Sequence, residues 1–261
     1  MDLAGFAIER FMGFLLVLFR VSGIFVITPV LGGSEVPWRI RVLASVALSF
    51  AIYPMLRPTT VAMPTDWPHL VVGMAGELAV GMICGFVVNI VFVAAQMGGA
   101  LLSRHMGTAL AQVMNPLFES SVPVLGQFYY MFALVVFVGV NGHHILIAGL
   151  VRTFDRIPLM GAGFHAGMVT TISGLMGDMF MLMIRLAAPT FVALFLVTVA
   201  LGIIARTVPQ IHVLIIGFPL KVCLGLVVTS LALAGAASLL AETFVWIMGR
   251  LEVVLQFMAV K

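Results

Sequence analysis

Charged residues are scarce in this sequence. Only 9% of its 261 residues are Asp, Glu, Lys or Arg, whereas 62% are hydrophobic, and the mean hydropathy is +1.22. This balance lies far outside that of soluble domains, and no stretch is polar enough to form such a domain. The composition therefore predicts an all-α, multi-helix integral membrane protein, with the whole chain (1–261) forming one apolar assembly.

The sequence also lacks the signatures of nucleic-acid binding, metal binding and catalysis. Its basic residues are scattered singly, so nucleic-acid binding is not expected despite a formal charge of +3. Cys84 and Cys223 stand alone in apolar runs, and the NGHH segment at 141–144 is better explained by a turn or helix break than by a metal site. Because no catalytic constellation, phosphate-binding glycine loop or HExxH motif occurs, we expect neither an enzyme nor a cofactor.

Apolar runs dominate the chain, and six of them are long enough to cross a hydrocarbon core of roughly 30 Å, the second only marginally. They cover residues 11–31, 40–56, 70–102, 122–150, 180–205 and 211–240. A further stretch, 242–260, is amphipathic at helical spacing and predicts a terminal helix packed on protein. Most prolines lie between runs and predict helical hairpins, whereas Pro189 and Pro219 lie inside runs and should kink them.

Four charged residues nevertheless lie within the apolar runs. They are Arg20, Glu77, Arg185 and Lys221. Each costs on the order of 3 kcal/mol at mid-membrane, so each needs compensation. Either they reach the membrane surface or form a structural ion pair such as Glu77 with Arg20, or they face a wet interior or a subunit interface. Glu77 is the only acid deep in a run, which argues against a proton-driven carrier.

Small residues in the third run predict close helix contacts. Gly81 and Gly85 form a G-x-x-x-G pair, a spacing that allows two helix backbones to touch. The sequence leaves open whether the touching helix belongs to this chain or to a neighbouring subunit.

Four segments carry a family resemblance that covers essentially the whole chain. They are RTVPQIHVLIIGFPLKVCLG at 206–225, FRVSGIFVITPVLGGSEVPWRIR at 19–41, HMGTALAQVMNP at 105–116 and NGHH at 141–144. Their order and spacing resemble the FliR family of flagellar biosynthetic proteins. The resemblance implies kinked helical hairpins, with a FliP-like portion (1–175) followed by a FliQ-like portion (176–261).

The resemblance also implies a function, that of a non-enzymatic subunit of the type III protein export gate. Its partners would be FliP, FliQ, FlhB and FlhA, and unfolded flagellar proteins would be the passing substrates. The location would be the bacterial inner membrane and the flagellar basal body. Two alternatives remain: the injectisome counterpart, and a small-molecule transporter in which the four intramembrane charges line the substrate site.

Two site predictions follow from the resemblance. The connector after the third run resembles a pore plug, and the matching positions here are Leu110, Val113, Met114, Asn115 and Pro116. Flexible Met and aliphatic side chains suit an adaptable apolar stopper, although the connector could instead merely pack under neighbouring helices.

The second site is the turn between the last two runs. Arg206, Pro209 and Gln210 resemble a cytoplasmic hairpin tip at the channel entrance. Two positions depart from the family pattern: Asn115 stands where Asp is usual, and His212 where Asn is usual.

Overall fold

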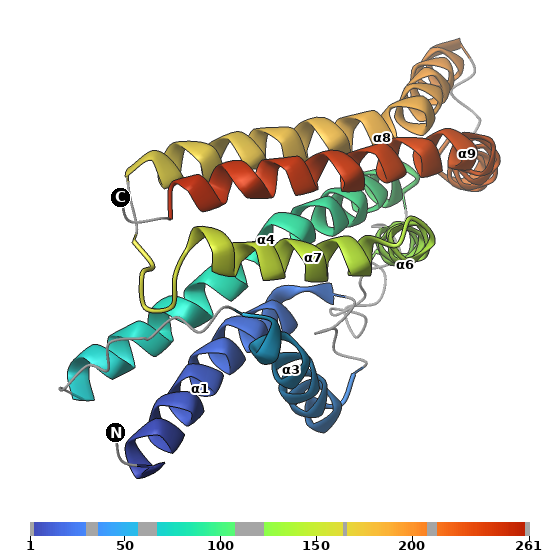
Figure 1. Cartoon of the computed structure of the whole chain (residues 1–261). Helices are drawn as coiled ribbons and strands as arrows, with labels where there is room; N and C mark the ends of the chain where they lie inside the picture. The colour runs from blue at the N-terminus through green and yellow to red at the C-terminus, as the bar shows by residue number, and fades with distance from the viewer. Residues whose placement is uncertain are drawn as a thin grey trace. The chain divides into compact units, whose positions relative to one another are not determined.

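The computed structural model describes residues 3–29, 36–56, 67–107, 123–163, 166–207 and 213–258, and nearly all of these residues lie in helices (Figure 1). In chain order the elements are α1 (Leu3–Ile27), α3 (Trp38–Ile52), the 3-10 helix η1 (Tyr53–Met55), α4 (Trp67–His105), α6 (Val124–Gly139), α7 (Gly142–Arg156), α8 (Ala166–Thr207) and α9 (Val213–Gln256). The prediction of an all-α membrane-type fold is confirmed.

Four of the described helices are long and apolar enough to cross a bilayer. These segments are Ile8–Ile27, Trp67–His105, Gly167–Thr207 and Ile216–Gln256, with mean hydropathies of 2.0 to 2.5. The last three contain 39 to 41 residues, about twice the length that a hydrocarbon core requires. Parts of these helices therefore extend beyond the core or run at a steep tilt.

The structure corrects two of the predicted spans. Run 40–56 forms the 15-residue α3, which at about 22 Å is too short to cross the core. Run 122–150 does not form one straight helix, because α6 and α7 meet at an angle of 71°, as in a broken span or a re-entrant loop. The break falls at Asn141, whose φ of 56° is left-handed, and this confirms the turn predicted from NGHH.

The sequence predicts a terminal helix packed on protein at 242–260. The described part of this stretch is helical, with Phe244, Ile247 and Leu251 buried, but it is not a separate helix. Residues 242–256 continue α9 without interruption. An amphipathic pattern replaces an apolar one at Glu242, but neither Gly nor Pro lies there to end the helix, and Glu is a good helix former. Pro189 and Pro219 do lie inside α8 and α9. Figure 1 shows α8 changing direction along its length, as a proline inside a helix favours.

Contacts divide the chain into two compact units, each built from segments distant in sequence. The first unit comprises 1–90, 141–176 and 244–261, and the second comprises 91–140 and 177–243. In the second unit the carboxy-terminal half of α4 packs on α6, where a Cβ at Gly99 would overlap the Leu125 backbone and Ser103 Oγ accepts a 3.3 Å hydrogen bond from Leu125 N. In the same unit α8 and α9 are joined by a 3.2 Å hydrogen bond between Thr190 and Thr229.

Helix α3, in the first unit, has its polarity reversed relative to a helix in water. It buries Ser45, Ser49 and Ile52, whereas Leu43 and Phe50 are 69% and 73% exposed. An exposed apolar face of this kind is suited to lipid or to another protein, not to water. The structure of this helix therefore supports the membrane assignment independently of hydropathy.

Candidate functional site

A buried charged centre lies in the first unit, where α1, α4 and α7 meet. Arg20 on α1 and Glu77 on α4 are both fully buried, and Arg20 Nε donates to Glu77 Oε2. The sequence left open whether these charges pair within the chain or face a wet interior or a subunit interface. The structure pairs them with each other inside a single unit.

Helix α7 supplies the other contacts of the guanidinium. Arg20 Nη1 donates to Thr153 Oγ1 at 3.3 Å and to the Ile157 carbonyl oxygen at 3.0 Å. The Phe154 ring lies 4.3 Å from the guanidinium carbon, at cation–π distance. Thr153 is oriented by its own hydrogen bond to the Leu150 carbonyl oxygen at 2.6 Å. The arginine thus ties the last turn of α7 to α1.

The second carboxylate oxygen of Glu77 holds the turn that follows α7. Glu77 Oε1 accepts a 2.8 Å hydrogen bond from Met160 N. Met160 has a φ of 66°, a left-handed conformation that costs a non-glycine residue free energy and needs support from its surroundings. Its side chain occupies the space beside Gly73, where a Cβ would lie 2.7 Å from Met160 Cε. The charged centre therefore fixes the path of the chain between α7 and α8.

Close contact between α1 and α4 allows the two charges to meet. A Cβ at Gly81 would overlap the Arg20 backbone, and one at Gly23 would lie 2.7 Å from Met82 N. Gly85 faces Ile24 and Thr28 of the same chain. The G-x-x-x-G pair thus packs within the chain, which answers the question that the sequence left open.

Replacing Gly81 with alanine is expected to destabilise the protein by about 3 kcal/mol, because the added methyl group must displace backbone atoms. Gly174 in α8 is the matched control, since among the described residues no atom lies within 4 Å of a Cβ built there. The Gly174→Ala change should be neutral or stabilising by up to about 1 kcal/mol. Thermal unfolding in detergent would measure both, and equal tolerance would show that α1 and α4 are not in tight contact.

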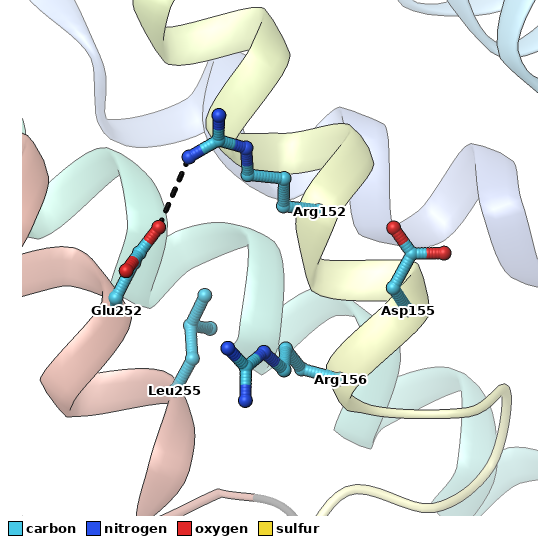
Figure 2. A pocket seen from close by; sticks show the side chains of 5 residues that line it. All are labelled: Arg152, Asp155, Arg156, Glu252 and Leu255. Carbon is cyan, nitrogen blue, oxygen red and sulfur yellow. Dashed lines mark hydrogen bonds and ion pairs between the residues drawn. The ribbon is translucent and has the colours of Figure 1, made fainter.

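A charged cavity of about 280 Å³ lies between α7 and α9 in the same unit (Figure 2). It is lined by Arg152, Asp155 and Arg156 of α7 and by Glu252 and Leu255 of α9. Arg152 Nη1 and Glu252 Oε1 are 3.0 Å apart, with side chains 70% and 54% exposed. A solvated pair of this kind contributes only about 0.2 to 1 kcal/mol, so it orients the two helices without anchoring them.

Neither region brings together a set of metal-binding side chains from the described residues. Within the described ranges no three His, Cys, Asp or Glu side chains lie close enough to hold a metal ion. His143 and His144 have ring centroids 4.2 Å apart, but no third ligand from the described part of the chain joins them. The buried centre can therefore hold helices in place, and nothing in its geometry suggests a reaction.

Arg20 and Glu77 are the predicted site residues that the structure brings together, and the other described ones lie apart from them. Arg185 is exposed near the middle of α8, Lys221 is half-buried in α9, and Arg206 is exposed in the last turn of α8. Pro209 and Gln210 of the hairpin tip lie outside the described residues, as do all five plug residues: Leu110, Val113, Met114, Asn115 and Pro116.

Sequence reasoning missed Thr153, Ile157 and Met160 as parts of the charged centre. Two of them contribute backbone atoms, which leave no trace in a sequence pattern. Thr153 is a polar residue on the buried face of α7, and that position was the one available signal.

The architecture and the buried ion pair define an integral membrane protein made of helices. A family model for bacterial export proteins, family 1, matches residues 11–246, and the chain belongs to this family. Among its relatives, the flagellar biosynthetic protein FliR of Bacillus subtilis (strain 168) is 32% identical over 224 residues, covering 84% of this chain and 85% of the relative. FliR of Escherichia coli (strain K12) is 29% identical, covering 80% and 79%. FliR of Caulobacter vibrioides is 25% identical, covering 88% and 91%.

Proposed function

We propose that this chain is a non-enzymatic subunit of the flagellar type III protein export gate. With FliP and FliQ it forms the channel through which unfolded flagellar proteins leave the cell, and FlhB and FlhA are neighbouring components. The observation that carries the proposal is the family match, which extends over residues 11–246 and so includes nearly every helix. The relatives described above are flagellar in name, which favours the flagellum over the injectisome.

The surface of the chain supports a role inside a larger complex. In the most apolar windows of the α8 and α9 spans, only 22% and 17% of the residues are buried. Those faces are therefore available to other subunits or to lipid. The proposed location is the inner membrane at the flagellar basal body, and the proposed division is a FliP-like portion (1–175) followed by a FliQ-like portion (176–261).

The transporter alternative loses support from the same structure. A transporter would place intramembrane charges around a substrate site. Here Arg20 and Glu77 neutralise each other in a packed core, and their other hydrogen bonds are to Thr153, Ile157 and Met160. Two of the four intramembrane charges are thus structural.

Co-expression of the tagged chain with FliP and FliQ from the same organism tests the proposal. We expect the three proteins to purify together in detergent, and we expect loss of the gene to abolish flagellar filaments. Recovery of the chain alone from such cells, together with normal motility of the deletion strain, would refute the export-gate assignment.

A further inference from the structure

An arginine lies on an exposed apolar face of α8 in the second unit. Arg185 is flanked by exposed Met181 and Ile184 before it and by exposed Val192 and Phe195 after it. A lone cation on an apolar helix face is costly in a membrane unless an anion neutralises it.

In the described part of the second unit, no carboxylate pairs with this arginine. Its described acidic residues are Asp178 and Glu242. Asp178 lies seven residues earlier on α8, about 10 Å along the helix axis. Thr190 and Thr229 share a hydrogen bond, and they lie at nearly the same distance in sequence from the connection between α8 and α9. The two helices are therefore antiparallel. Glu242 on α9 consequently lies near the level of Asp178 on α8. Among the described residues, no hydrogen bond or ion pair involves Arg185.

The exposed face around Arg185 also has the spacing of a helix-packing seam. Met181, Arg185, Ala188, Val192, Phe195 and Val199 recur at intervals of four and three residues. This alternation keeps one stripe of a helix facing a partner helix, and Ala188 allows close approach. The acyl chains of lipids could cover the apolar side chains of this stripe, but they carry no anion to neutralise the guanidinium.

We propose that this stripe of α8 docks an apolar helix of a neighbouring subunit, and that a carboxylate on that helix pairs with Arg185. The inference rests on the proposed function, since the neighbour is a subunit of the same export gate. It adds the chemistry of the contact: one Asp or Glu on an otherwise apolar helix, facing the guanidinium.

Substitution of Arg185, with the chain expressed both alone and with FliP and FliQ, tests the pairing. Arg185→Leu should lower recovery of the complex at least about tenfold, because the partner's buried carboxylate loses its counter-ion. The membrane level of the chain expressed alone should not fall, since the change makes α8 more apolar. Arg185→Lys should retain part of the recovery, and Arg104→Leu, which replaces an exposed arginine outside α8 and α9, should retain all of it.

Unchanged recovery of the Arg185→Leu complex would overturn the inference and indicate that the arginine reaches lipid headgroups or water. Failure of the unaltered chain to purify with FliP and FliQ would instead refute the proposed function.

A second measurement is needed if Arg185→Leu lowers the membrane level of the chain expressed without FliP and FliQ, because the loss of complex would then not report the pairing. A fluorophore at Val192→Cys, in a Cys223→Ser background, should be quenched by brominated phosphatidylcholine when the chain is alone in nanodiscs. We expect that quenching to disappear in the complex. Quenching that persists in the complex would show that the stripe faces lipid and would reject the docking proposal.

Discussion

Replacing Glu77 with glutamine should destabilise the protein by about 3 to 5 kcal/mol, because the buried Arg20 charge then loses its counter-ion. Glutamine keeps a side-chain oxygen that can still accept from Met160 N, so the loss reports the charge rather than the hydrogen bond. Arg20→Met should cost a similar amount, since it leaves the Glu77 carboxylate buried and unpaired. Thermal unfolding in detergent and the yield of folded protein in membranes would measure both changes.

The double variant Arg20→Met/Glu77→Gln separates an ion-pair effect from simple loss of contacts. It removes both charges, keeps apolar volume at position 20 and retains the acceptor for Met160 N. Replacing a buried ion pair with neutral groups is often close to neutral in stability. We therefore expect the double variant to be more stable than either single variant. If the two losses add instead, the charges do not depend on each other.

The ion pair shows what a sequence can and cannot establish about such a site. The apolar runs containing Arg20 and Glu77 required each charge to be compensated, and pairing between them was one explanation open from the sequence. The contact with Met160 was not accessible in this way. This contact depends on the left-handed conformation of Met160 in a turn. The donor to the Glu77 carboxylate is the backbone N–H of Met160, and every non-proline residue has such a group, so the sequence does not mark it.

The helix boundaries illustrate a second limit. The break at Asn141 could be predicted because an Asn-Gly pair is a local turn signal that interrupts a helix. The ends of the apolar runs were poorer guides, since α8 begins at Ala166, well before the run at 180–205. Hydropathy marks where a helix could contact lipid, whereas its length depends on where the backbone hydrogen bonds stop. Residues such as Thr170 and Ser173 continue the helix without being apolar.

The arrangement of α4 and α6 bears on the plug proposed at Leu110, Val113, Met114, Asn115 and Pro116, in the connection between these helices. These two helices contact each other directly in the second unit, through Gly99, Ser103 and Leu125. The connection between them is therefore much longer than the contact requires, since short connections commonly join antiparallel helices. A connector of surplus length and apolar composition calls for another role, and closing the channel is the role that we propose.

Deleting residues 108–113 should leave the complex assembled but leaking ions. The deletion removes six of the fifteen residues in 108–122, and nine remain to join helices that already pack on each other. It takes away Leu110 and Val113, two of the apolar side chains proposed to seal the lumen. A polar or shortened connector would leave a path for water and ions. Growth under salt stress and ion flux, in cells making the deleted gate at matched expression, would measure the leak.

Recovery of the complex decides between the plug and a structural connector. If the segment packed under neighbouring helices, its deletion would expose apolar surface worth about 25 cal/mol per Å², and the complex should fall apart. Substituting Leu110, Val113 and Met114 together with serine should reproduce the leak at full chain length, whereas Thr108→Ala should not leak. An assembled complex that stays ion-tight after the deletion would show that the barrier lies elsewhere, because a seal without its apolar side chains cannot exclude water.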